Sequence, residues 1–154
     1  MAIAFSSTAF KDGEHIPVKY TGDGRNVSPP LTWNGIPAKA ASIALIVHDP
    51  DAPRPGGFTH WVVFNLPVGS NGLPEGVPVR ERLENGVTQG RNDAGRQGYL
   101  GPAPPPGKPH HYHFMLYALD QPLRLGSNAG WQQVLEAIKG HVLDEAEMVG
   151  LYQR

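Results

Sequence analysis

HDPDAPRPGGFTHWVVFN, residues 48–65, is the stretch of this chain that decides its fold. An apolar run over 43–47 leads into it and a second run over 61–66 leads out, so the stretch joins two buried strands. Between the runs lie three prolines, which fix φ, and a Gly-Gly pair, which allows positive φ, so the loop has a specified backbone shape. Shaped loops on a rigid sheet are common places for binding or chemistry. The polar side chains placed here are Asp49, Asp51 and His60.

The length and composition predict one domain without a nucleic-acid or membrane partner. The chain has 154 residues and no linker or repeat divides it, so we expect a single domain over 1–154. A formal net charge of -1 without a basic run argues against nucleic acid and anionic membrane surfaces as partners. The lack of cysteine excludes disulfides and thiolate metal sites. We see no signal peptide and no apolar run near the roughly 20 residues of a membrane span, so we expect a cytoplasmic protein.

The spacing of turn residues predicts a mostly β sandwich. Its 19 glycines and 16 prolines are spread along the chain and separate short apolar runs. Residues 42–47 are almost continuously apolar, which is typical of a strand buried on both faces. The tail is ambiguous, because 142–147 could be helical while 148–152 suits a strand. The other strands that we expect lie at 2–6, 16–20, 31–33, 61–66 and 111–119.

One amphipathic helix is predicted over 131–139. Its apolar residues recur at i, i+3, i+4 and i+7, which places them on one face. We expect Ser127 or Asn128 to cap its start and Gly140 to end it. The residues of the apolar face are Trp131, Val134, Leu135 and Ile138.

Asp49 and His60 stand at the ends of two successive apolar strands. If these strands are neighbours in one sheet, the two side chains can meet at its rim. A carboxylate beside a histidine favours the protonated ring, so the pair could bind an anionic head group or transfer a proton. The alternative is a structural Asp–His hydrogen bond that only fixes the loop.

A second cluster of histidines, HHYH, allows an argument from strand geometry. Alternate residues of a strand share a face, so His111 and His113 point one way while His110 and Tyr112 point the other. The first pair has an i, i+2 metal-ligand spacing, but further ligands would have to come from distant groups such as His60. The second pair places a histidine beside a phenol, which suits a small anion. We therefore favour a small anion over a metal ion as the ligand, and no motif of the chain predicts a cofactor.

Four segments carry a resemblance to a known family. They are NVSPPLTW (26–33), DPDAPRPGGFTHWVVFNLP (49–67), GYLGPAPPPGKPHHYHFMLYALD (98–120) and MVGLYQR (148–154). In this order, and spanning nearly the whole chain, they resemble the bacterial and archaeal branch of the phosphatidylethanolamine-binding protein family, also called the Raf kinase inhibitor protein family. The resemblance implies a phosphatidylethanolamine-binding-protein-like β-sandwich, with a large central antiparallel sheet, a smaller sheet and one or two short helices.

The resemblance also implies a pocket at the rim of the sheet for phosphate-like, acetate-like or phosphoethanolamine groups. The family supplies an aspartate, a first histidine, a His-x-Tyr pair, a glycine that lends its backbone N–H, and an aromatic residue that is tryptophan in animal relatives. By position in the motifs these residues are Asp49, His60, His110 with Tyr112, Gly101 and Phe58, respectively. The expected task of the aspartate is to orient and charge a neighbouring histidine.

This chain departs from the animal members around the expected pocket. Residues 54–57, Arg-Pro-Gly-Gly, replace a longer insert that includes a pocket tyrosine, and Ala103 stands where many relatives have Gly or Cys. The C-terminal helix of the animal proteins has no counterpart after Arg154. We therefore expect a pocket that is more open, or one that is closed by a second subunit in a homodimer.

Three functions are compatible with these motifs. The leading hypothesis is a non-catalytic protein that binds a small anion or a phospholipid head group. The second is a hydrolase of small phospho- or acyl esters that uses the Asp–His pocket, although the matched motifs offer no obvious Ser or Cys nucleophile. The third is a regulator in kinase or protease signalling, which would bind a protein partner at the rim of the pocket.

Overall fold

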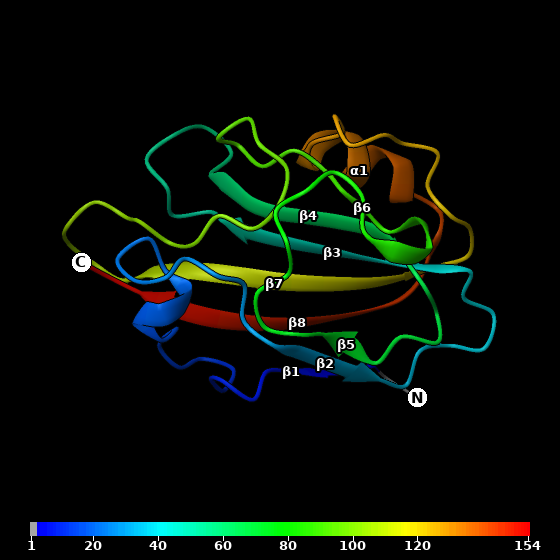
Figure 1. The fold of residues 1–154 in the computed structure, drawn as a ribbon, viewed down its shortest axis with the longest axis horizontal. Helices are drawn as coiled ribbons and strands as arrows, with labels where there is room; N and C mark the ends of the chain where they lie inside the picture. The colour runs from blue at the N-terminus through cyan, green and yellow to red at the C-terminus, as the bar shows by residue number, and fades with distance from the viewer. Residues whose placement is uncertain (1–2) are drawn as a thin grey trace.

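The computed structural model describes residues 3–154, and its centre is an antiparallel sheet of five strands (Figure 1). The strands are β3 (Ser42–Asp49), β4 (Phe58–Leu66), β6 (Thr88–Gln89), β7 (His110–Leu119) and β8 (Val142–Tyr152). Their order across the sheet is β6-β4-β3-β7-β8, so β3 is hydrogen-bonded to β4 on one side and to β7 on the other.

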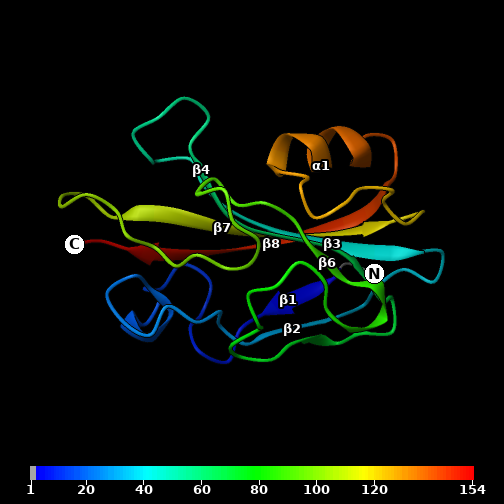
Figure 2. The ribbon, with the colours of Figure 1, turned by 45° about the horizontal axis from the view of Figure 1, so that its top comes forward.

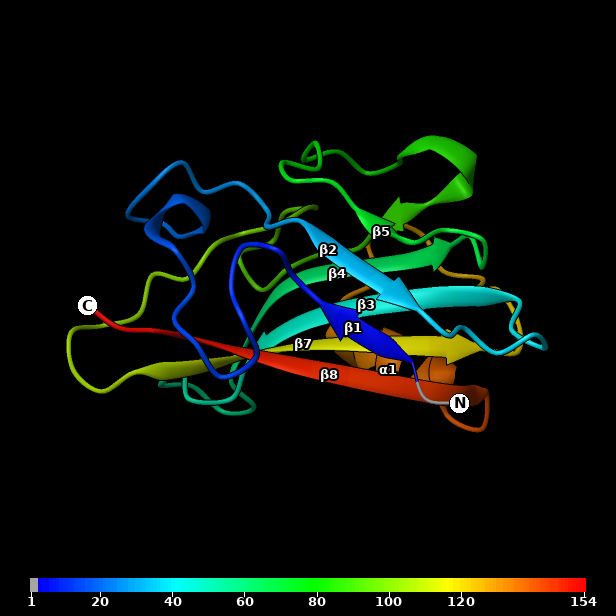
Figure 3. The same ribbon diagram turned by 90° about the horizontal axis from the view of Figure 1, so that it is seen from below.

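A smaller sheet and one helix cover the two faces of the large sheet. The smaller sheet contains β1 (Ala4–Ser6), β2 (Leu31–Asn34) and β5 (Gly72–Leu73), paired antiparallel in the order β1-β2-β5. Figure 2 shows this sheet on one side and the helix α1 (Trp131–Ile138) on the other, and Figure 3 shows β1, β2 and β5 in front of the large sheet. Two 3-10 turns complete the elements, η1 (Val18–Tyr20) and η2 (Glu84–Gly86). The predicted mostly β sandwich with a large and a small antiparallel sheet is confirmed.

The alternation of side chains along β3 explains the three layers. Leu45 and Val47 pack toward the smaller sheet with Trp33, whereas Ala44 and Ile46 pack under α1. Every residue of β3 is buried, which confirms the expectation of a strand covered on both faces. A fully buried aliphatic side chain contributes roughly 1.5–3 kcal/mol, so the central strands hold the layers together.

The helix forms with almost the predicted bounds but with a different N-terminal cap. Gly130 is the N-cap residue, and its N–H donates to the side-chain oxygen of Gln133 at 2.7 Å. The expected caps, Ser127 and Asn128, lie before this position. Gly140, at φ 79°, follows the end of the helix as expected.

Two of the strand predictions were wrong or incomplete. Residues 16–20 do not form a strand, because Pro17 offers no N–H and η1 begins directly after it. Residues 142–147 are not helical but form the first half of β8, which pairs with β7 along nearly its whole length. Of the strand expected at 2–6, Ala4–Ser6 is observed, while Ala2 lies outside the described residues.

The helices found in residues 3–154 are all too short or too polar to cross a membrane. The sheet instead provides a rigid edge at which functional side chains can gather. Because β3 is antiparallel to β4 and β7, its last residue, Asp49, lies beside the first residues of both neighbours.

Candidate functional site

A cavity of about 260 Å³ lies at this edge of the large sheet. The sequence motifs that line it are far apart in the chain and meet only because three adjacent strands start or end here. All six residues expected from the sequence contribute to its wall. They are Asp49, Phe58, His60, Gly101, His110 and Tyr112.

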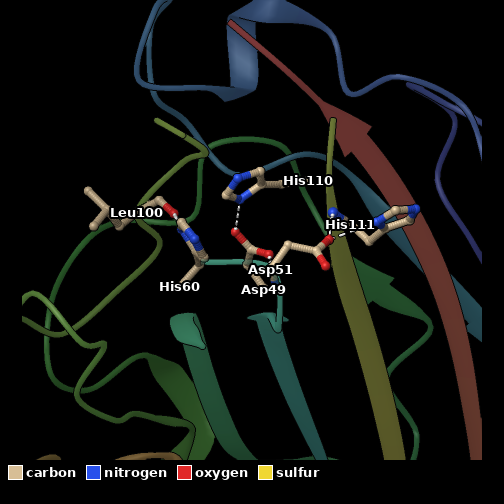
Figure 4. A network of polar contacts seen from close by, with 6 residues as sticks. All are labelled: Asp49, Asp51, His60, Leu100, His110 and His111. Carbon is tan, nitrogen blue, oxygen red and sulfur yellow. Dashed lines mark hydrogen bonds and ion pairs between the residues drawn. The ribbon is translucent and has the colours of Figure 1, made fainter. Parts of the chain in front are cut away.

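The shortest side-chain contact in the cavity joins Asp49 to His110. The Nδ1–H of His110 donates to Oδ2 of Asp49 at 2.6 Å, and the other carboxylate oxygen accepts the N–H of Asp51 at 2.8 Å (Figure 4). Asp49 and His60 both line the cavity, as expected for side chains that meet at the rim, but the hydrogen bond considered between them is not formed. β3 and β4 are neighbours, but Asp49 lies opposite Phe58 in the register and its carboxylate turns toward β7.

His60 is oriented by the backbone instead of by an acid. Its Nδ1–H donates to the carbonyl oxygen of Leu100 at 2.7 Å, because a carbonyl can only accept (Figure 4). Burial lowers the pKa of His60, and the hydrogen bond to Leu100 opposes this shift only in part. The ring is therefore favoured in its neutral form, with Nε2 as a hydrogen-bond acceptor.

Tyr112 supplies a hydroxyl group to the same cavity. Its ring meets the ring of His60 edge to face, with the ring centroids 5.2 Å apart. Burial, with the charge of Asp49 adding to it, raises the pKa of Tyr112 well above its usual value. No hydrogen bond joins this hydroxyl to another residue in the described range 3–154, so its O–H is free to donate to a ligand.

The backbone N–H of Gly101 is already in use. It donates to Oδ1 of Asn26 at 2.6 Å, so the expected donation of this N–H to an anion does not agree with the geometry. Gly101 instead permits a close approach of chain segments. A Cβ at this position would lie 2.5 Å from Asn26 Oδ1 and 2.5 Å from the carbonyl oxygen of Tyr20.

A second Asp–His pair lies next to the first, but outside the cavity. Nδ1 of His111 lies 2.7 Å from Oδ2 of Asp51, and the side chain of His111 is 53% exposed, against 12% for His110 (Figure 4). His113 also faces away from the cavity and lies 3.3 Å from Glu147. The predicted division of the histidines between two faces of the strand is confirmed. Across residues 3–154, no three His, Cys, Asp or Glu side chains are grouped so that they could hold a metal ion.

The comparison with known families agrees with these motifs and this geometry. A family model described as phosphatidylethanolamine-binding protein matches residues 6–153. The chain belongs to the phosphatidylethanolamine-binding protein family. The resemblance expected from the four sequence segments is therefore confirmed.

Relatives within the phosphatidylethanolamine-binding protein family come from both archaea and bacteria. A UPF0098 protein of Methanothermobacter thermautotrophicus is 55% identical over 146 residues, which are 95% of either chain. A UPF0098 protein of Pyrococcus abyssi is 46% identical over 151 residues, covering 96% of this chain and 84% of that protein.

Two solved structures show the same fold. A putative phosphatidylethanolamine-binding protein homologue from Chlamydia trachomatis has a TM-score of 0.90 at 39% identity, covering 99% of this chain and 98% of that chain. YbcL of E. coli, described as a new member of the mammalian phosphatidylethanolamine-binding protein family, has a TM-score of 0.92 at 35% identity, covering 100% and 99%.

The structure adds three residues that sequence reasoning did not assign to the site. Leu100 orients His60 through its carbonyl oxygen, and Asn26 holds the Gly101 N–H. Both lie in quoted segments of the phosphatidylethanolamine-binding protein family, so the segments contained the signal but not the contacts. Arg54, from the loop between β3 and β4, lines the cavity as well.

Proposed function

We propose that this chain binds a small oxyanion, such as the phosphate of a head group, in the cavity at the edge of the large sheet. The observation that carries the proposal is the arrangement of His60, His110 and Tyr112. Each histidine has its Nδ1–H committed to a protein acceptor, which fixes the ring and leaves Nε2 for a ligand. The tyrosine adds a free O–H donor.

The protons of this arrangement predict how binding depends on pH. A histidine that donates through Nδ1 presents a lone pair on Nε2 unless it takes up a second proton. An oxyanion offers mainly acceptors, so each histidine that contacts it needs a proton, either on the ring or on the ligand. Anion binding should therefore take up protons and become weaker as the pH rises.

The size of the cavity favours a head group or a small metabolite. Its volume of about 260 Å³ lies just below the range of roughly 300–1,000 Å³ that is typical of drug-sized ligands. The polar groups named above come from the strand ends, while most of the remaining wall is apolar. The apolar members are Ala52, Pro53, Leu100, Ala103, Pro104 and Pro105.

A calorimetric titration with inorganic phosphate and with phosphoethanolamine at pH 6 and pH 8 tests the proposal. We expect binding that is weaker at pH 8 and lost in His110→Ala. His111→Ala is the matched control, because it changes the neighbouring histidine, which lies outside the cavity. No binding of inorganic phosphate at either pH, or equal losses in the two variants, would contradict the proposal.

The same proteins can be tested for the two other functions. Release of phosphate or of a carboxylic acid from small esters, lost in His60→Ala, would replace the binding function by hydrolysis. Capture of a protein partner that competes with phosphate would instead support a regulatory role at the rim of the cavity.

A further inference from the structure

Arg54 brings a positive charge to the mouth of the cavity. It lies in the loop between β3 and β4, where its N–H donates to the carbonyl oxygen of Ala52 at 2.7 Å and its own carbonyl accepts the N–H of Gly57 at 3.1 Å. Its guanidinium carbon lies 5.4 Å from the centroid of the Phe58 ring. Arg54 and Phe58 both line the cavity, so this cation–π contact directs the guanidinium along the wall.

This guanidinium has no carboxylate partner among residues 3–154. The cavity contains one acid, Asp49, and its carboxylate already accepts the ring N–H of His110. Arg54 also borders a neighbouring hollow that contains Asp93, but the Asp93 carboxylate accepts the N–H of Thr59 at 2.8 Å. The positive charge of Arg54 is therefore available to a ligand.

We propose that Arg54 selects ligands that carry a second negative group beside the bound oxyanion, such as short phosphorylated carboxylic acids, over zwitterionic head groups. This inference rests on the proposed function, because it needs an oxyanion at the histidines. A guanidinium offers a planar fork of N–H donors that fits a carboxylate, whereas it repels an ammonium group.

The cavity also lacks a free acid that could receive an ammonium group. Asp49 is buried and paired with His110, so the acid that faces the cavity is occupied. Most of the other residues that line the cavity are apolar, which suits a short aliphatic link between the two anionic groups of the ligand. Phosphoethanolamine would place its ammonium group on the same short link, close to the guanidinium.

Three probes separate these possibilities in calorimetric titrations, namely inorganic phosphate, phosphoglycolate and phosphoethanolamine. In the unmodified protein we expect phosphoglycolate to bind about tenfold more tightly than phosphoethanolamine, as one charge-assisted hydrogen-bonded contact would give. In Arg54→Gln the ratio of the Kd for phosphoethanolamine to the Kd for phosphoglycolate should fall about tenfold. The ratio is the readout because a general loss of folded protein lowers both affinities together.

Two further variants control for charge and geometry. Lys39→Gln removes one positive charge from an exposed position at the opposite end of β3, and should leave the ratio unchanged. Arg54→Lys keeps the positive charge but lacks the planar fork of N–H donors, so it should keep only part of the preference for phosphoglycolate over phosphoethanolamine.

The outcomes distinguish this inference from the proposed function. If inorganic phosphate does not bind the unmodified protein, both are wrong. If phosphate binds but phosphoethanolamine binds as tightly as phosphoglycolate, or if Arg54→Gln leaves the ratio unchanged, the oxyanion site stands and the role of Arg54 is overturned.

Discussion

Replacing Asp49 with asparagine removes the buried carboxylate that accepts the Nδ1–H of His110 at 2.6 Å. The other oxygen accepts the N–H of Asp51 at 2.8 Å, so an asparagine can keep this bond through its carbonyl and turn its NH₂ group toward His110. Nδ1 of the ring must then accept, and the single ring proton moves to Nε2. His110 can still donate to a bound anion, but as a neutral imidazole, whereas the ring beside Asp49 needs a second proton to donate through Nε2 and is then charged.

The magnitude of the effect follows from this change in charge. A hydrogen bond that involves a charged group contributes roughly 1.5–3 kcal/mol, and one between neutral groups contributes roughly 0.5–1.5 kcal/mol. The midpoints of these ranges differ by about 1.3 kcal/mol, which corresponds to a change in Kd of roughly tenfold. We therefore expect Asp49→Asn to weaken phosphate binding about tenfold, although it removes a negative charge from the cavity.

The assay is a calorimetric titration with inorganic phosphate in two buffers that differ in ionisation enthalpy. We expect Asp49→Asn to take up about one proton fewer on binding than the unmodified protein, because the variant ring already carries its proton on Nε2. Asp51→Asn is the matched control, since Asp51 pairs with the exposed His111 outside the cavity. Unchanged or tighter binding by Asp49→Asn, or an equal loss in Asp51→Asn, would refute the reasoning.

Two further predictions concern stability. Gly101→Ala places a Cβ 2.5 Å from Asn26 Oδ1 and should lower the free energy of unfolding, measured in urea, by about 1–3 kcal/mol. Gly69→Ala is the control, because its Cβ meets open space and should change the free energy of unfolding by no more than about 0.5 kcal/mol. Equal effects of the two variants would contradict the close packing at Gly101. Burial lowers the pKa of both His48 and His60, so below about pH 6.5 the unfolded chain binds protons that the folded chain does not. The Tm should therefore fall between pH 7 and pH 5.5, and a rise over this interval would count against the burial of neutral rings.

The local sequence pattern was sufficient to predict features that are set within a single strand, such as its burial and the face on which each side chain lies. The apolar run before Asp49 predicted a strand buried on both faces, and the structure has β3 in this state. The alternation of His110 to His113 predicted which rings share a face, because side chains on a strand alternate with a fixed period. The motif segments identified the family for the same reason, since they depend on order along the chain.

The sequence patterns failed in two segments, for two different reasons. The sequence of residues 142–147 is compatible with a helix or a strand, and its backbone pairing with β7 makes it a strand. Residues 16–20 suit a strand by composition, but Pro17 leaves no N–H for a neighbouring strand at that position.

Only the tertiary structure decided which polar groups meet in the cavity. The sequence placed Asp49, His60 and His110 at one edge, but it could not show that the acid bonds to His110 while a backbone carbonyl holds His60. Nor could it show that Asn26 occupies the N–H of Gly101. The physical reason is that a strand pattern fixes the face on which a side chain lies, whereas its hydrogen-bond partner depends on the register, the rotamer and loops that arrive from elsewhere in the chain.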